Sequence, residues 1–496
     1  MKHFTKLLSA MLALLLLISA MAFVTSCKKN DAENENDTVG TTATDDNLPA
    51  LETKNLGGME IAMLWPNVNS DGHFIHNELD VETVSTGDVI DLAVRNRNSV
   101  VETTYNVRIS TVLMSHSKIP TTVKTEGQAG ESSYQAIATT IGKMTPIAQE
   151  GWLENYNNLE YYSESQTWWN HSLMQDFAIA NARYFGSGDI IYSDDLYPYT
   201  TFVNNTVVDQ YGIEENFHEL VKTGQWTLEK FHNIAKYVAS PELDGDPDKW
   251  SEADMNGALM NPNMFKAIYY SAGKGMLEFD KSGYPIWAMT VEHTQPILEK
   301  AIAMVFNDGA CLNTGALDGN HAEYELNLFV SGRSLFLCEE LILAERITKN
   351  DASTDYTVLP FPKYEEESEY ISVLNNAVVI SVPVMAENKN EISLILSAMG
   401  RESINTLTPA FFETVLTYRY MQNPESVESL EIILASTKAP DVATIQDWGG
   451  FMAGYKALAE QSSTNFSSFH TKNIGTAMGA LEEYSVLLDN YYKNKN

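Results

Sequence analysis

The chain has 496 residues, of which 66 are acidic and 32 basic, so its formal net charge at pH 7 is -34. This excess of negative charge excludes nucleic acid as a partner, because phosphate groups would be repelled. With only three cysteines, the fold must depend on an apolar core, and the length is sufficient for two compact lobes.

The N-terminus predicts a secretory signal. Lys2 and Lys6 precede an apolar run, Leu7–Phe23, that ends in Val24-Thr25-Ser26-Cys27. The small residue before the cysteine and the branched residue two places further back resemble the bacterial lipobox, whose cysteine is acylated and becomes the mature first residue. We therefore predict a signal peptide over 1–26 and a lipid anchor on Cys27.

Two other interpretations of this segment were weighed. An ordinary signal peptide could carry a cysteine by coincidence, and a transmembrane helix would need about 20 apolar residues, more than this run supplies. The lipid anchor places the mature protein on the extracytoplasmic face of the cell membrane. The polar segment that follows cannot order itself by burial, so 27–55 is predicted to be a lipidated, flexible, acidic tether.

The globular part begins with a strand, helix, strand pattern. A strand is predicted over Glu60–Trp65 and a helix over Asp88–Thr104, where Ile90, Ala93, Val94 and Val101 share one stripe. Alternation over Val107–Thr111 predicts a second, parallel strand. Similar patterns further along predict an α/β fold. The further strands are Ile190–Tyr192, Ser334–Cys338, Tyr356–Leu359 and Ala377–Val382, and the clearest further helices are Thr227–Ser240 and Asn388–Met399.

Several short segments occur in a characteristic order along the chain. They are Arg95–Arg97 leading into Tyr105–Val107, Gly151–Glu154, Gly224–Phe231, Phe329–Phe336 and Leu359–Lys363. Together they resemble the extracellular solute-binding lipoproteins of ATP-driven (ABC) importers, in the carbohydrate class that includes maltose-binding protein. The chain departs from that pattern at Gln135, where relatives place an aspartate, and at Phe202–Asn205, where many have an aromatic-Asn-Lys strand.

The resemblance implies a two-lobed, periplasmic-binding-protein-like type II fold with a multi-strand hinge. Lobe one would comprise 56–197 and 377–417, and lobe two would comprise 198–376 and 418–496. The chain would cross between lobes near Tyr197–Asn205, Asn375–Val382 and Thr417–Pro424. A ligand would lie in the groove between the lobes.

A sugar site needs flat rings to stack on C–H faces and carboxylates or amides to bond hydroxyl groups. Most candidates come from segments that face the ligand in the relatives, whereas the two glutamates are chosen because they follow the Gly332–Phe336 strand. They are Trp65, Asn67, Asp194, Asp195, Tyr269, Tyr270, Glu339, Glu340 and Trp448. Asp194 and Asp195 are taken to end a strand, so at most one of them should contact ligand, and one of the two adjacent tyrosines is expected to do so. The pair Trp168-Trp169 is assigned to packing.

Enzymatic interpretations are weaker. Ser271–Lys274 and Lys222–Gly224 match two motifs of penicillin-binding enzymes, but their order is reversed and no Ser-Asp-Asn lies between them. His73 and His76 have the spacing of metal ligands but no convincing third ligand. A glycosidase needs two carboxylates across a cleft, and no motif identifies such a pair. We predict no catalytic residue, metal or cofactor.

The sequence thus predicts a lipid-anchored, monomeric substrate-binding protein of an ABC importer. Its partners would be a small solute, which the resemblance implies is a sugar or oligosaccharide, the permease subunits and, through the anchor, the membrane. The alternative is a surface lipoprotein that binds or cleaves glycans. The spacing of Cys311 and Cys338 leaves open whether they form a disulfide or remain thiols.

Overall fold

The structure is a computed structural model, and it describes residues 48–67, 76–81, 88–178, 181–240, 254–261, 263–305, 309–316, 321–374, 377–412, 424–438 and 447–493. The chain divides into two units, Met1–Thr44 and Asp45–Asn496. All described residues belong to the second unit. The predicted signal peptide, Cys27 and most of the tether lie outside them.

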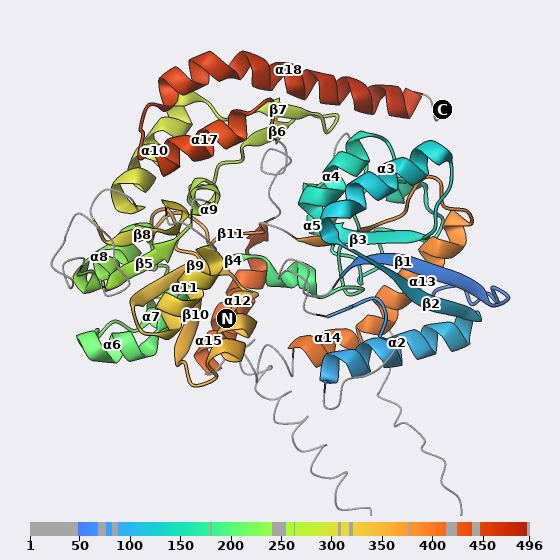
Figure 1. Ribbon diagram of the computed structural model, residues 1–496, viewed down its shortest axis with the longest axis horizontal. Coiled ribbons are helices and arrows are strands. Elements are labelled where there is room, and N and C mark those ends of the chain that lie inside the picture. The colour runs from blue at the N-terminus through green and yellow to red at the C-terminus, as the bar shows by residue number, and fades with distance from the viewer. Residues whose placement is uncertain are drawn as a thin grey trace, which may run out of the picture. The chain divides into compact units, whose positions relative to one another are not determined.

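The first lobe is built on a four-stranded sheet in the order β12-β3-β1-β2 (Figure 1). The strands are β1 (Met59–Pro66), β2 (Val107–Met114), β3 (Ala136–Thr140) and β12 (Val378–Ser381). β1 runs parallel to both neighbours, whereas β12 is antiparallel to β3. The helices are α2 (Val89–Tyr105), α3 (Ile119–Ala129), α4 (Ile141–Gln149), α5 (His171–Asp176), α13 (Lys389–Ser403) and α14 (Leu407–Pro409), with 3-10 helices η1 (His116–Lys118), η2 (Tyr156–Asn158) and η3 (Ser193–Leu196).

Helix α2 illustrates how local sequence fixes an element. Asp88 is its N-cap, and its Oδ1 accepts from the backbone N–H groups of Ile90 and Asp91 at 3.0 and 3.1 Å. Asn106 ends the helix in the left-handed conformation, with φ 50°. The predicted stripe of Ile90, Ala93, Val94 and Val101 is buried, as a helix packed along one face requires.

The second lobe has a five-stranded sheet in the order β10-β4-β9-β5-β8. The strands are β4 (Tyr199–Asn204), β5 (Asn256–Met260), β8 (Cys311–Asn313), β9 (Ser334–Glu340) and β10 (Tyr356–Pro360). β4 is antiparallel to β9 and β10, while β5 is parallel to β8 and β9. The surrounding helices are α6 (Asn205–Tyr211), α7 (Phe217–Lys222), α8 (Leu228–Val238), α9 (Met264–Ser271), α10 (Val291–Val305), α11 (His321–Val330), η4 (Thr314–Ala316), α12 (Leu343–Asn350) and α15 (Pro424–Ala435).

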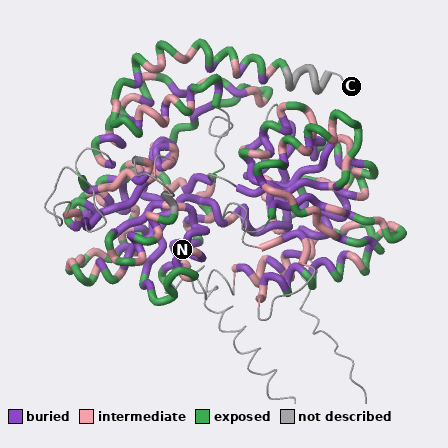
Figure 2. The backbone as a smooth tube through the Cα atoms, in the orientation of Figure 1, coloured by how far each residue is buried: buried purple, intermediate pink, exposed green. Residues whose placement is uncertain are grey.

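An aromatic cluster holds the helices of this lobe to its sheet. Phe231 stacks on Phe336 at 4.8 Å between ring centroids, and Trp226 meets both rings edge to face. The indole N–H of Trp226 donates to the Pro360 carbonyl at 2.9 Å, so this buried ring has its polar atom satisfied. Figure 2 shows that buried residues concentrate in the sheets of both lobes.

A hairpin and two C-terminal helices complete the second lobe. The hairpin consists of β6 (Leu277–Phe279) and β7 (Pro285–Trp287), and the helices are α17 (Phe451–Glu460) and α18 (Phe466–Lys493). α18 packs on α17, α10 and β7, and it also contacts α4 of the first lobe. Among the described residues, no helix is both long and apolar enough to cross a membrane.

Three segments that connect the lobes lie side by side. Pro198 and Leu374 form an antiparallel bridge, and β11 (Ser372–Val373) pairs in parallel with β13 (Thr437–Lys438). The Leu374 N–H donates to the Lys438 carbonyl at 2.9 Å. The two-lobed α/β fold with a hinge of several strands is therefore as predicted, and each large sheet draws its strands from one of the predicted lobes. The lobe boundaries themselves stay a prediction, and the crossing near Thr417–Pro424 lies almost wholly outside the described residues.

Most of the elements predicted from sequence are confirmed, with Thr227 as the N-cap of α8 and Trp168 and Trp169 buried in the core. The strand predicted over Ile190–Tyr192 is wrong. Those residues form a turn that leads into η3, because the N–H groups of Tyr192 and Ser193 donate to the carboxylate of Glu78 rather than to a neighbouring strand. Asp194 and Asp195 therefore lie in a 3-10 helix and do not end a strand.

Candidate functional site

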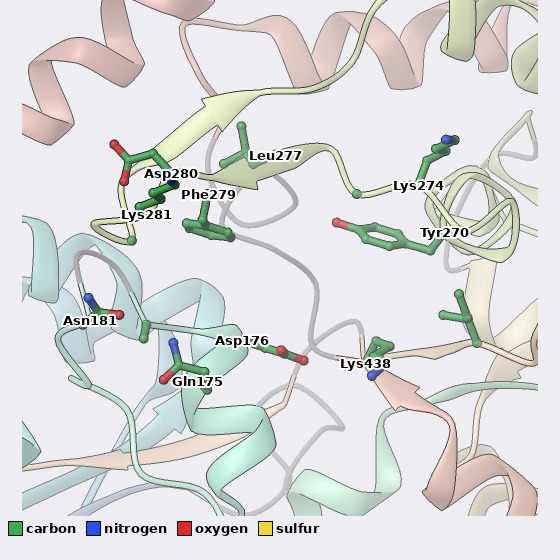
Figure 3. A pocket seen from close by; sticks show the side chains of 15 residues that line it. Gln175, Asp176, Asn181, Tyr270, Lys274, Leu277, Phe279, Asp280, Lys281 and Lys438 are labelled. Carbon is green, nitrogen blue, oxygen red and sulfur yellow. The ribbon is translucent and has the colours of Figure 1, made fainter.

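A cavity of about 520 Å³ lies between the two lobes, beside the connecting segments (Figure 3). One wall comes from the first lobe, where α5 and the residues after it contribute side chains. The opposite wall comes from the end of α9 and the β6–β7 hairpin, and the connecting segments supply the rest. The lining side chains used below are Gln175, Asp176, Asn181, Tyr270, Lys274, Phe279, Lys281 and Lys438.

Two aromatic rings line the cavity from the second lobe. Tyr270 lies in the last turn of α9 with only 7% of its surface exposed, and its phenol group points into the cavity in Figure 3. Phe279 lies in β6 and is 40% exposed. Its ring faces the cavity from the hairpin. A fixed ring and an accessible ring on one wall provide apolar faces suited to stacking.

Charged side chains of both signs surround these rings. Lys274 follows α9, Lys281 lies in the hairpin turn and Lys438 lies in β13, while Asp176 reaches in from α5 (Figure 3). In the described part of the chain, none of the three lysine ammonium groups forms an ion pair. Ammonium groups donate hydrogen bonds, as a site for a polar solute requires.

A hydrogen bond joins the two walls at Asn181. Its side-chain Nδ2 donates to the Ser282 carbonyl in the hairpin turn at 3.3 Å. Asn181 has φ 59°, a conformation that asparagine tolerates better than most residues, and its carbonyl accepts from Asn157 at 2.9 Å. Asn181 is thus held in the position from which it contacts the second lobe.

Most of the residues predicted from sequence lie elsewhere. Trp65 is fully buried in β1, where it packs in the core of the first lobe. Asn67 follows the same strand and is exposed, and its N–H donates to Met114. Trp448 has φ 42° and is 97% buried, with its ring edge to face against Tyr484 at 5.8 Å. Neither tryptophan lines the cavity.

Asp194 and Asp195 belong to a carboxyl cluster beside the connecting segment of the first lobe. Asp194 is 2% exposed and accepts from the Ser187 hydroxyl and the Gly188 N–H. Asp195 is half-buried. Burial, with the charges of Asp189 and Glu78 next, raises the pKa of Asp195 to about 7, and burial also raises the pKa of Asp194.

Glu339 and Glu340 end β9 in a second carboxyl cluster, in the other lobe. Glu340 is 7% exposed, whereas Glu339 is half-buried and accepts from Asn261 Nδ2 and the Glu340 N–H. Burial raises the pKa of Glu339, and the pKa of neighbouring Glu325 is raised by burial and then by the charge of Glu339. Tyr269, fully buried, contacts Tyr270 edge to face at 6.2 Å.

Of the nine predicted ligand contacts, Tyr270 lines this cavity, and Phe279, Lys274, Asn181 and Lys438 were missed. A usable signal existed for the hairpin, since two short apolar runs flank the turn residues Asp280–Gly283. No such signal marked Asn181 or Lys438, because their place depends on how the lobes and connecting segments pack. Ser271 of the apparent acylation motif is 1% exposed, and its hydroxyl donates to the Ile268 carbonyl, which is a structural role.

Comparison with known proteins gives a consistent picture of the fold. No family model and no curated protein matches the sequence. Solved structures do match it. An ABC substrate-binding protein of Listeria monocytogenes, in complex with cycloalternan, aligns with a TM-score of 0.53 over 88% of this chain and 99% of its own, at 14% identity. The fold is that of the ABC substrate-binding proteins.

Two further matches share that fold. The galacto-N-biose-/lacto-N-biose I-binding protein of a Bifidobacterium longum ABC transporter, in complex with lacto-N-biose, aligns with a TM-score of 0.56 over 86% of this chain and 98% of its own, at 10% identity. A Mycobacterium tuberculosis protein in complex with glycerophosphocholine aligns with a TM-score of 0.52 over 88% and 99%, at 13% identity. At these identities the likeness concerns the fold.

Proposed function

We propose that this protein is the substrate-binding component of an ABC importer and that it captures a sugar or oligosaccharide between its lobes. The observation that carries the proposal is an inter-lobe cavity lined by Tyr270, Phe279 and three lysines, within a fold shared with proteins whose structures hold cycloalternan and lacto-N-biose. Rings for C–H faces and polar groups for hydroxyls suit a carbohydrate.

Within each carboxylate pair, burial favours one member as a ligand contact. Asp194 and Glu340 are almost fully buried, whereas Asp195 and Glu339 are half-buried. Neither Asp195 nor Glu339 lines the cavity described above, so they would bind hydroxyl groups only of a ligand that extends beyond it, and the other two have structural roles. Tyr270 takes the stacking role proposed for the tyrosine pair, and Asn67 remains a candidate at the edge of the first sheet.

The protein would act by binding and closure, without chemistry. A ligand that contacts both lobes favours the closed arrangement by its higher affinity for it, and the permease would recognise that arrangement. The connecting segments beside the cavity are where such a motion would be accommodated. A monomer is sufficient for this mechanism.

The anchor proposed at Cys27 would keep the protein near the permease. A tethered binding protein samples a membrane partner at high effective concentration. Replacement of the cysteine, Cys27→Ala, should move the protein from the membrane fraction to the soluble fraction of cells that process lipoproteins. Retention in the membrane fraction would argue against the anchor.

A thermal-shift screen tests the binding function. A soluble form that begins after Cys27 would be tested against mono- and oligosaccharides, polyols and peptides. A ligand at about 100 times its Kd adds about 2.7 kcal/mol to the free energy of unfolding, a shift of a few degrees at this size. A shift with one sugar class that is lost in Tyr270→Ala supports the proposal. If only a glycan polymer binds, or is cleaved, the protein is instead a surface glycan lipoprotein.

A further inference from the structure

Three side chains that can bind a metal lie together at the N-terminal end of α2: His76, the N-cap Asp88, and Asp91 in the first turn. His76 Nδ1 lies 3.8 Å from Asp88 Oδ2 and 3.7 Å from Asp91 Oδ1. All three ligand atoms lie within 4.8 Å of one another. From sequence, His76 was paired with His73, no third ligand was found and no metal was predicted. His73 lies outside the described residues, and the approach of Asp91 to His76 depends on the fold.

These separations are too long for hydrogen bonds between the imidazole and the carboxylates. They match the spacing of ligands around a single ion. Two nitrogen or oxygen ligands, each about 2.0–2.2 Å from zinc, lie roughly 3–4 Å apart at the angles of a four-coordinate site. The two separations from His76 therefore fit ligands of one ion, and the two carboxylate oxygens lie within 4.8 Å of each other.

The two oxygens of Asp88 have different roles. Oδ1 caps α2 by accepting the N–H groups of Ile90 and Asp91, and Oδ2 is the atom that faces His76. The side chains are sheltered, with 18% exposed for His76, 24% for Asp88 and 12% for Asp91. Partial exposure leaves a route for an ion to enter.

Surrounding contacts hold the His76 segment in place. The buried guanidinium of Arg97 donates to the carbonyls of Glu78 and Leu79 at 2.7 and 3.2 Å, and Asn98 Nδ2 donates to Leu79 at 2.9 Å. Because α2 supplies Arg97, Asn98 and both aspartates, the histidine and the carboxylates share one rigid support. Such support is what a metal site requires of the residues around its ligands.

We propose that His76, Asp88 and Asp91 bind a divalent transition-metal ion of the zinc class. One imidazole nitrogen and two carboxylate oxygens suit zinc better than calcium, which takes oxygen ligands. Two carboxylates balance the two positive charges of the ion. The ion would fasten residues 76–81 to α2, a structural role independent of the proposed transport function.

The test uses the full-length protein, purified in detergent, stripped of metal with a chelator and titrated with Zn²⁺ against a chromogenic competitor. We expect one equivalent to bind at neutral pH and to raise the Tm. Asp88→Asn is the key variant, because asparagine caps a helix as well as aspartate but loses the charged ligand. Its Kd for Zn²⁺ should rise by at least about tenfold, as should those of His76→Gln and Asp91→Asn.

The control is His293→Gln, which removes an exposed histidine on α10. It should leave the Kd and the zinc-dependent Tm shift unchanged. The three site variants should also keep the metal-free Tm of the parent protein, with Asp88→Asn closest to it. The proposal is overturned if Zn²⁺ does not bind at one equivalent, or if it binds the site variants as tightly as the parent.

Discussion

At the scale of single residues, Tyr270 provides the sharpest test of the cavity. Tyr270→Ala should weaken ligand binding about tenfold, because a stacked ring contributes roughly 1 kcal/mol beyond its buried area. Tyr270→Phe keeps the ring and should retain most of the affinity. Isothermal titration with the ligand found by the screen would measure both.

Tyr237→Ala is the matched control for that experiment, since Tyr237 is a 67% exposed tyrosine on α8. It should bind ligand as the parent does. Equal losses in both alanine variants would show that Tyr270 acts through stability and does not contact the ligand.

Asp189 carries a prediction about pH. Burial raises its pKa from 3.8 to about 6, although a hydrogen bond from Thr408 at 2.7 Å opposes the shift. An acid whose pKa is raised by folding contributes stability below its unfolded pKa and loses it as the pH rises through the folded pKa. Asp189→Asn should therefore match the parent below about pH 4 and be more stable above about pH 6, by on the order of 2 kcal/mol.

Chemical denaturation of parent and variant across that range would measure the difference. Asparagine can still accept the Thr408 hydroxyl, so loss of that hydrogen bond should not mask the effect. A variant that is less stable than the parent at both ends of the range would contradict the assignment.

Burial is where residue-level prediction was weakest. Trp65 was nominated because it follows the first strand, yet β1 is an inner strand with β3 and β2 on either side, and its last residues are buried on both faces. The alternation of apolar and polar residues along a strand identifies one buried face, but it cannot reveal that both faces are covered. Trp448 was nominated by resemblance, and its packing against Tyr484 depends on α18, which no local pattern placed there.

At the scale of elements, the close contact of β5 with its neighbours predicts one severe substitution. A β-carbon on Gly257 would overlap the carbonyl oxygens of Ala235 and Ala310. Backbone atoms cannot move aside as a flexible side chain can, so Gly257→Ala should lower the free energy of unfolding by about 3 kcal/mol. Urea denaturation would measure it.

Gly479→Ala is the counterpart on α18, where a β-carbon meets no atom within 4 Å. It should raise stability by up to about 1 kcal/mol, because alanine favours a helix interior more than glycine. Two glycine-to-alanine changes of opposite sign would test the packing of β5 and the exposure of α18 together. If both substitutions changed the free energy of unfolding in the same direction, either the close packing of β5 or the exposure of α18 would be contradicted.

Elements with strong local signals were predictable. α2 and α8 have side-chain N-caps, Asp88 and Thr227, and periodic apolar faces, and both were found within about two residues of their ends. The turn at Ile190–Tyr192 was predicted to be a strand because it contains the apolar and β-branched residues that are common in strands. What decides its structure is Glu78, distant in sequence, which takes its hydrogen bonds.

At the scale of the whole molecule, the balance of acidic groups sets the pH at which the protein is most stable. Burial raises the pKa of Asp189 to about 6 and that of Asp195 to about 7, and it raises the pKa of Glu339 as well. As the pH rises and each of these groups ionises, the free energy of unfolding of the protein falls. Repulsion within a chain of net charge -34 acts in the same direction.

We therefore expect a higher Tm near about pH 5.5 than near about pH 8. Added salt should raise the Tm at the higher pH by screening the net charge. Differential scanning calorimetry at two pH values and two salt concentrations would measure both effects. A Tm that rises from the lower to the higher pH would show that other groups control the stability.

The fold as a whole was predictable because ordered short segments along the chain resemble those of two-lobed binding proteins. The residues of the site were harder to predict from sequence. Its walls come from α5, the end of α9, the hairpin and β13, and side chains as distant in sequence as Asp176 and Lys438 meet there only once both lobes and their connections are packed. Local sequence specifies each wall but not their juxtaposition.

The state of the cysteines has a practical consequence. Cys311 and Cys338 are both thiols, on β8 and β9, which are separated in the sheet by β5. Cys338 is fully buried, and burial raises its pKa to about 12, so it should not react at neutral pH. Cys311 is partly exposed. A soluble form that begins after Cys27 therefore offers one position for a thiol-directed fluorophore, so that a single dye can be attached to the second lobe without any engineered cysteine.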